Sequence, residues 1–201
     1  MVIYMMRHGE TAWNVQHLFQ GRTDIPLNEN GRKVAEWTRD GLRDVHFDLA
    51  FCSPLCRAKE TAQIILEGRD VKLIEDERII EMGFGEYEAT SMRNPDEELE
   101  IFFKHPEAYV DKKGIEPFEE VLARAQNFLD ELTANPEYQD STILVATHGA
   151  MLRGLIGAFR GYTVKDFWKG GIHKNCGMTI VEVQGKEKKI LQEAIVLYKE
   201  K

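Results

Sequence analysis

The chain of 201 residues is 43% hydrophobic and 30% charged, a composition typical of a soluble globular protein. Its formal net charge of −8 argues against a general binder of nucleic acids or anionic membranes, which would present a basic face. The sequence has no apolar run near the roughly 18 residues of a membrane-spanning helix, and no basic leader with the cleavage site of a signal peptide.

The three cysteines indicate the cellular environment. They are odd in number and form no CxxC pair, which favours reduced thiols and a cytoplasmic location. Cys52 and Cys56 have a C-x3-C spacing without a nearby histidine, so a metal site there is disfavoured. We therefore expect neither a metal ion nor a cofactor.

The first predicted strand covers residues 2–6, an almost continuous apolar run that is typical of a strand buried on both faces. This run leads directly into the tripeptide Arg7-His8-Gly9. A helix is predicted over residues 28–42, with Asn28 as its N-cap.

The next predicted elements are a short strand over residues 47–52 and a helix over residues 53–67. We expect Ser53 to cap this helix and Pro54 to occupy its first position. A third strand is predicted over residues 71–74.

Residues 86–114 have neither a strand pattern nor a clear core-helix pattern. They contain the acidic run PDEELE and two prolines. We expect a single domain over residues 1–201, with a lid or cap inserted at about residues 86–117.

The last third of the chain begins with an amphipathic helix predicted over residues 118–132. A fourth strand, residues 142–146, is followed by His148-Gly149, as the first strand is by His8-Gly9. The remaining predictions are a helix over residues 150–159 and two strands over residues 178–183 and 190–197.

Strands that alternate with helices predict an α/β fold with a mostly parallel sheet and helices on both faces. Ligands of such sheets bind beyond the carboxyl ends of the strands. There, His8 and His148 would meet Arg7 and Arg57, beside helix N-termini that favour anions. A single histidine after a strand is more often structural than functional. Here, however, three predicted strand ends together provide histidines and arginines that suit the same anionic ligand. Arginine forks match phosphoryl oxygens, so the sequence predicts a phosphate site.

Five blocks of the chain point to a known family. They are RHGETAWN (7–14), QGRTDIPLNENG (20–31), SPLCRAKETA (53–62), EMGFGEYEA (81–89) and THGAMLRGLIGAFRG (147–161). Through these blocks the chain resembles the histidine phosphatase superfamily, the phosphoglycerate mutase-like proteins. The resemblance covers most of the chain and implies the phosphoglycerate mutase-like α/β fold.

The resemblance also implies a role for each residue of the phosphate site. His8 would be the nucleophile that forms a phosphohistidine, and Glu81 would donate a proton to the leaving oxygen. Arg7, Arg57 and His148 would hold the phosphoryl group and stabilise its transition state. Further phosphate-binding residues would be Asn14, Gln20, Gly21 and Gly149, the last through its backbone amide.

Two departures from the family pattern concern substrate specificity. The chain has Tyr87-Glu88-Ala89 where the family's phosphatases commonly read WEG. Residues 114–117 read GIEP where these phosphatases commonly read GGES. The missing glycine and serine affect groups expected to contact substrate, whereas the implied catalytic residues are unchanged.

The implied function is metal-independent hydrolysis of small phosphorylated metabolites. The alternative is phosphoryl transfer of the cofactor-dependent phosphoglycerate mutase type, although such mutases usually carry a longer insertion after the Glu81 block. A second alternative is an inactive module that binds phospho-ligands, which would need the arginines but not both His8 and Glu81. The sequence leaves the physiological substrate and the oligomeric state open.

Overall fold

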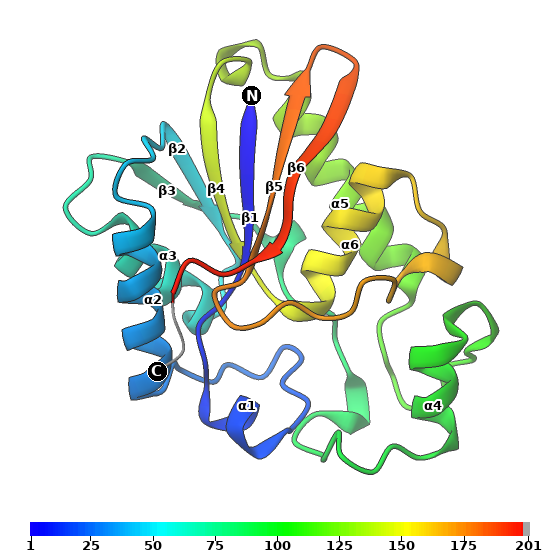
Figure 1. Cartoon of the computed structure of the whole chain (residues 1–201). Coiled ribbons are helices and arrows are strands. Elements are labelled where there is room, and N and C mark those ends of the chain that lie inside the picture. The colour runs from blue at the N-terminus through cyan, green and yellow to red at the C-terminus, as the bar shows by residue number, and fades with distance from the viewer. Residues whose placement is uncertain (199–201) are drawn as a thin grey trace.

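The computed structural model describes residues 1–198 and contains a six-stranded sheet between layers of helices (Figure 1). The strands are β1 (Val2–Arg7), β2 (Leu49–Cys52), β3 (Lys72–Glu75), β4 (Thr142–Thr147), β5 (Met178–Gln184) and β6 (Glu187–Ile195). Their order across the sheet is β3-β2-β4-β1-β5-β6. Each of these strands overlaps one that the sequence predicts, and β6 begins earlier than predicted.

The sheet combines a parallel part with an antiparallel edge. Strands β3, β2, β4 and β1 pair in parallel, whereas β5 pairs antiparallel with both β1 and β6. The prediction of an α/β fold with a mostly parallel sheet is confirmed. The two strands of this edge, β5 and β6, form a hairpin around Gly185-Lys186.

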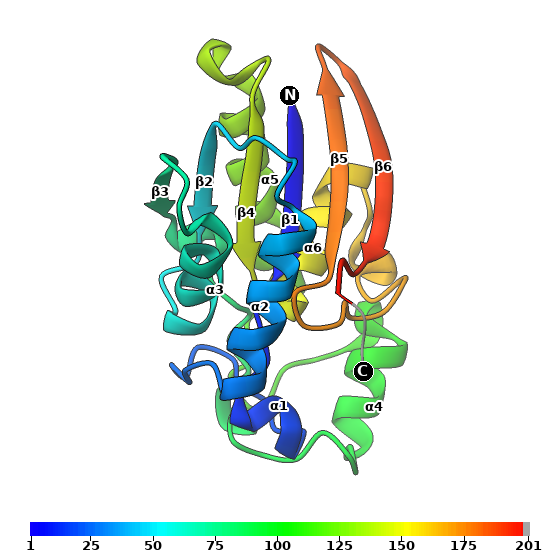
Figure 2. The same ribbon diagram turned by 60° about the vertical axis from the view of Figure 1, so that its left-hand side comes forward.

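Helices cover both faces of the sheet (Figure 2). One face carries α2 (Glu29–Gly41) and α3 (Cys56–Leu66), and the other carries α5 (Phe118–Ala134) and α6 (Gly149–Arg160). Alternate residues of β1 enter different cores: Ile3 and Met5 pack in the core with α5 and α6, whereas Met6 packs in the core with α2 and α3. Residues 2–6 are therefore a strand with apolar contacts on both faces, as predicted.

The predicted N-cap of α2 is confirmed. The side-chain oxygen of Asn28 accepts a hydrogen bond of 2.7 Å from the Gly31 amide. The amide groups of Asn28 and Asn30 also donate to the Glu10 carboxylate, which ties α2 to the segment after β1. Within residues 1–198, no helix has both the length and the apolar character needed to cross a membrane.

Helix α3 begins at Cys56, so the prediction that Ser53 caps it is wrong. The N-cap is Leu55, which makes no side-chain capping bond, and Pro54 precedes the helix. Ser53 directly follows β2 and is fully buried, and its hydroxyl bonds to His148 instead. The serine therefore belongs to the sheet edge rather than to the helix.

Two short helices, α1 (Ala12–Gln16) and α4 (Glu97–Lys104), lie beyond the carboxyl ends of the parallel strands (Figure 1). Helix α4 lies within the stretch assigned to the cap, where the sequence has no clear core-helix pattern, and Leu99 and Phe102 of this helix are buried. An acidic eight-residue helix with two buried side chains is too short to show clear periodicity. Short 3-10 helices occupy Glu77–Ile79, Gly85–Tyr87, Pro106–Ala108, Pro136–Tyr138 and Val164–Asp166.

Candidate active site

Strands β1 and β4 bring two histidines together at their carboxyl ends. Arg7, the last residue of β1, is in register with Thr147, the last residue of β4. His8 and His148 follow, and the centroids of their buried rings lie 5.2 Å apart. The two similar tripeptides of the sequence thus meet at one place in the fold.

The ring of His8 presents a free electron pair. Burial, together with the positive charges of Arg57 and Arg7, holds the pKa of His8 well below its ordinary value, so the ring is neutral near pH 7. Its Nδ1 lies 2.6 Å from the carbonyl oxygen of Gly9, which only accepts, so Nδ1 carries the proton and donates. Nε2 is therefore unprotonated and able to act as a nucleophile.

In the ring of His148, the nitrogen that a neighbouring residue engages is Nε2 instead of Nδ1. Its Nε2 lies 2.6 Å from the Ser53 hydroxyl, which accepts from the Leu55 amide at 3.3 Å and can donate its own proton to Nε2. Burial, then the charge of Arg57, holds the pKa of His148 well below its ordinary value. The single proton of the neutral ring is then on Nδ1, which is buried without a partner among residues 1–198.

Two arginines stand beside these rings, each held by backbone carbonyl groups. The fully buried Arg57 donates from Nη2 to Gly21 at 2.7 Å and from Nη1 to Thr23 at 2.9 Å. Arg7 donates from Nη1 to the His173 carbonyl at 2.6 Å. The Nε atoms of both arginines are buried and have no partner in the described part of the chain. Each guanidinium group therefore has an N–H group that can donate to a bound ligand.

The loop that holds Arg57 is fixed in turn by Glu88. This carboxylate accepts from the backbone amides of Arg22 and Thr23, both at 3.0 Å. It also occupies the space beside Gly21, where a Cβ would lie 1.9 Å from its Oε1 and where φ is +52°. Only glycine fits there. The acidic residue after Tyr87 is thus a support for the loop that anchors Arg57.

The Asn14 side chain is oriented by the capping box of α1. Its Oδ1 accepts from the Thr11 amide at 3.1 Å and from Asn175 at 3.2 Å, while the Asn14 amide is 3.2 Å from the Thr11 hydroxyl. With its oxygen engaged, the side-chain NH₂ of Asn14 is left facing the pocket that it lines. Gln20 is held similarly, because its Oε1 lies 3.0 Å from the Thr11 hydroxyl.

Glu81 sits against the first turn of α6. Its Oε1 accepts from the amides of Met82 and Met151, both at 2.9 Å, and its Oε2 accepts more weakly from Ala150 at 3.3 Å. The oxygen Oε2 also lies 3.8 Å from the position that a Cβ on Gly149 would occupy. The N-terminus of α6 thus holds the carboxyl group of Glu81, and its less engaged oxygen, Oε2, lies beside Gly149, which the resemblance assigns to the phosphate site.

The segment that carries Glu81 is fixed from α5. Arg124 donates to the carbonyl groups of Arg78 at 2.7 Å and Ile80 at 2.6 Å. Its guanidinium also pairs with both carboxylate oxygens of Glu116, at 2.8 and 3.0 Å. Glu116, the third residue of the GIEP sequence, accepts from the Gly83 amide as well, so this departure from the family pattern retains a structural carboxylate.

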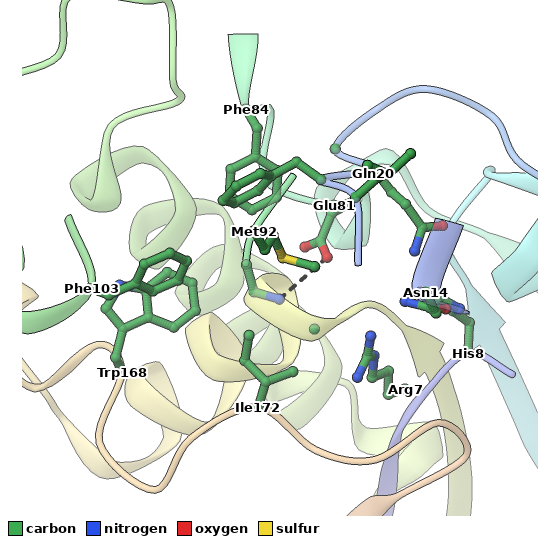
Figure 3. A pocket seen from close by; sticks show the side chains of 15 residues that line it. Arg7, His8, Asn14, Gln20, Glu81, Phe84, Met92, Phe103, Trp168 and Ile172 are labelled. Atoms are coloured by element: carbon green, nitrogen blue, oxygen red, sulfur yellow. Dashed lines mark hydrogen bonds between the residues drawn. The ribbon is translucent and has the colours of Figure 1, made fainter. Parts of the chain in front are cut away.

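These groups border a pocket with two different sides (Figure 3). The polar side consists of Arg7, His8, Asn14 and Gln20, with Glu81 adjoining it. Gly21 and Gly149 also line the pocket. The opposite side is formed by apolar side chains that include Met92 and Phe103 of the predicted cap. Arg57 and His148 are fully buried and do not border the pocket themselves. The structure thus brings all the sequence-predicted site residues to this end of the sheet.

The polar side can bind a dianion and accept a phosphoryl group. Three buried nitrogens have no acceptor among residues 1–198: Nε of Arg7, which lines the pocket, and Nε of Arg57 and Nδ1 of His148, which lie behind it. Buried donors are normally paired, so these three nitrogens are suited to donate to an anionic ligand. A neutral imidazole with an open Nε2 stands next to them. In the described residues, no group of three or more His, Cys, Asp or Glu side chains could hold a metal ion.

Several supporting residues were not predicted from the sequence. Ser53 and Glu88 lie inside the five blocks that resemble the family, and Ser53 also follows a strand end. Their positions in the sequence could therefore have indicated a role at the site. Thr61 accepts from the Gly9 amide at 2.9 Å, and its partner is far away in the sequence. The contacts of Arg124 and Asn175 are equally non-local, and no local pattern marks them.

Comparisons with known proteins agree with this geometry. The model of the histidine phosphatase superfamily (branch 1) matches residues 3–195. The adenosylcobalamin/alpha-ribazole phosphatase of Salmonella typhimurium is 31% identical over 92% of both chains. A 2,3-bisphosphoglycerate-dependent phosphoglycerate mutase of Cytophaga hutchinsonii is 31% identical, over 77% of this chain and 75% of the mutase. The solved structure of Bacillus stearothermophilus YhfR superimposes with a TM-score of 0.88 and 31% identity, over 97% of each chain.

Proposed function

Because the chain belongs to the histidine phosphatase superfamily, we propose that it hydrolyses small phosphomonoesters through a phosphohistidine formed on His8. The observation that carries this proposal is the state of the His8 ring. It is neutral, its Nδ1 donates to the Gly9 carbonyl, and its Nε2 is unprotonated. The ring lines the pocket beside buried donors that have no partner among residues 1–198. A covalent intermediate divides one difficult displacement into two easier ones.

In the first step, Nε2 of His8 attacks phosphorus and the bond to the leaving oxygen breaks. Arg7 and Arg57 compensate the charge on the equatorial oxygens, with Nδ1–H of His148 as a further donor. The proton for the leaving oxygen comes from Glu81, whose Oε2 is the less engaged oxygen.

In the second step, a water molecule attacks the phosphohistidine from the side that the alcohol has left. Glu81, now deprotonated, takes a proton from this water, and the N–P bond to His8 breaks. Inorganic phosphate is released, and both residues return to their starting states.

We also assign residues 86–117 as a cap over the leaving group, because Met92 and Phe103 line the pocket.

Phosphoryl transfer of the mutase type would use the same first step, and a similar mutase exists. The mutase reaction differs in its second step, because the phosphoryl group passes from the histidine to a hydroxyl group of the substrate instead of to water. A binding module would retain the arginines without turnover. The chain's three cysteines are unpaired, which is compatible with the cytoplasmic location that we propose.

One assay separates these functions: release of inorganic phosphate from 4-nitrophenyl phosphate in the presence of EDTA, with the His8→Ala variant as control. We expect multiple turnovers for the wild-type protein and none for the variant. Interconversion of phosphoglycerate isomers without phosphate release would replace the proposal with a mutase. Binding of phosphate without any turnover would replace it with a binding module.

A further inference from the structure

The apolar side of the pocket is lined by aromatic and aliphatic side chains. Its side chains come from segments far apart in the sequence: Leu18, Phe19, Phe84, Met92, Phe103, Trp168 and Ile172. In Figure 3, the labelled members of this group lie on the side of Glu81 away from His8 and Asn14. An ester whose phosphorus is attacked by His8 would therefore have its leaving group on this apolar side, here called the apolar wall.

This wall is preformed by contacts between aromatic rings. The rings of Phe103 and Trp168 lie 5.1 Å apart, and the Trp168 indole donates to the Phe102 carbonyl at 2.9 Å. Phe19 contacts Phe84 at 5.0 Å and lies nearly parallel to Phe103 at 6.2 Å. Because the rings hold one another, the wall needs little reorganisation to accept an apolar group.

The wall lacks a partner for a charged leaving group. Among the described residues that line the pocket, Arg7 is the only arginine or lysine, and it belongs to the phosphoryl side. Glu81 is the only acidic one, and the leaving oxygen engages it. A carboxylate or ammonium group on the alcohol would lose its hydration against aromatic carbon without an ion pair, which is costly.

We infer that the preferred substrates are phosphomonoesters of uncharged apolar alcohols, in particular those that carry an aromatic ring. This inference rests on the proposed function and specifies its substrate class. It predicts that small polar phosphorylated acids and amines are poor substrates, even though they share the phosphoryl group.

The test compares kcat/KM for 2-phenylethyl phosphate, ethyl phosphate and phosphoserine, all of which release an alkyl alcohol. We expect 2-phenylethyl phosphate to exceed ethyl phosphate by about 30-fold, the effect of burying one ring. Phosphoserine should fall below ethyl phosphate. Preference for phosphoserine over 2-phenylethyl phosphate would overturn the inference while leaving the hydrolytic function intact, whereas no release from any ester would remove the proposed function itself.

Variants locate the preference in the wall. Phe103→Ala should lower the ratio of kcat/KM for 2-phenylethyl phosphate to kcat/KM for ethyl phosphate by about tenfold. Val110→Ala is the matched control, because Val110 belongs to the same segment, is 70% exposed and does not line the pocket. Equal losses for both esters with Phe103→Ala would contradict the inference.

A second variant avoids the risk that loss of Phe103 disturbs the fold. Ile172 lines the pocket from an exposed position, so Ile172→Lys adds a cation at little structural cost. We expect the ratio of kcat/KM for phosphoserine to that for ethyl phosphate to rise by about tenfold, as a new ion pair forms. An unchanged ratio would show that leaving groups do not reach this wall.

Discussion

His8 and His148 occupy equivalent positions after adjacent strands, yet each uses a different ring nitrogen. A backbone carbonyl fixes the proton of His8 on Nδ1, and the Ser53 hydroxyl binds Nε2 of His148. One ring therefore presents an electron pair and the other a donor. The different hydrogen-bond partners thus suit His8 to act as a nucleophile and His148 to stabilise negative charge as a donor.

The fork of Arg57 can be tested by Arg57→Lys. Lysine keeps the charge but cannot reach the carbonyl groups of Gly21 and Thr23 while also offering a donor to the phosphoryl group. We expect kcat/KM to fall by about 100-fold, and inhibition by inorganic phosphate to weaken less, because the fork acts mostly in the transition state. Arg32→Lys, on the surface, is the control. Wild-type activity of Arg57→Lys would place Arg57 outside the site.

The proton donor can be tested by Glu81→Gln. The amide can retain the contacts from Met82 and Met151 but has no proton to transfer. We expect kcat/KM for 2-phenylethyl phosphate to fall by about 100-fold and kcat/KM for 4-nitrophenyl phosphate by less than about tenfold. This parameter reports formation of the phosphohistidine, in which nitrophenolate leaves unaided, and not the later attack of water that Glu81 also assists. The exposed Glu86 is the control, whereas Glu88 is unsuitable because it holds the Arg57 loop. A uniform loss for both esters would assign Glu81 to positioning.

At the scale of elements, the turn after η2 (Gly85–Tyr87) stores a local strain. Ala89, where the family's phosphatases commonly have glycine, adopts φ +67° although it has a Cβ. The side chain is exposed, so replacing it loses little packing. We expect Ala89→Gly to raise the free energy of unfolding by about 0.5–1 kcal/mol, the strain relieved less the added chain entropy.

Urea unfolding of Ala89→Gly checks this expectation, with Ala123→Gly as the control. Ala123 is exposed within α5, where glycine should destabilise the protein by about 1 kcal/mol. Destabilisation of similar size in both variants would show that Ala89 is not strained.

Elements were predictable where their signals were local. The apolar runs of β1 and β4 and the Asn28 cap of α2 could be located from the sequence alone. Helix α4 could not, because only Leu99 and Phe102 mark its buried face. The start of α3 was misplaced because Ser53-Pro54 has the local pattern of a helix start, while a partner distant in the sequence, His148, determines the role of Ser53.

At the scale of the whole molecule, buried histidines make stability depend on pH. Burial, then the charge of Arg153, lowers the pKa of His173 to about 4, and the pKa values of His8 and His148 are also lowered. In the unfolded chain these groups take up protons near pH 6.5. The unfolded state therefore binds more protons below that pH, and stability is lost progressively as the pH falls from about 6.5 toward 4.

We expect the free energy of unfolding to decrease between pH 6.5 and 5.5 by about 1 kcal/mol for each of these histidines. Urea titrations in phosphate-free buffers measure this change. A stability that is constant or rises over this interval would contradict the neutral state assigned to the buried rings.

The site as a whole was predictable in its reacting groups but not in its supports or its specificity. His8, Arg7, Arg57 and His148 stand at or near strand ends, and sheet topology converts such positions into proximity. Arg124 and Glu116 act through contacts with Ile80 and Gly83, which only the folded chain creates. The apolar wall likewise assembles from distant segments, so no single stretch of sequence describes it.

Chemical trapping of the phosphohistidine tests the central claim most directly. After rapid quenching of turnover with radiolabelled 4-nitrophenyl phosphate, we expect base-stable, acid-labile label in the peptide that contains His8. Alkaline hydrolysis should yield the isomer phosphorylated on Nε2, because Nδ1 donates to the Gly9 carbonyl. The His8→Ala variant should carry no label. Label on His148, on Nδ1 of His8, or on no residue during sustained phosphate release would contradict the account.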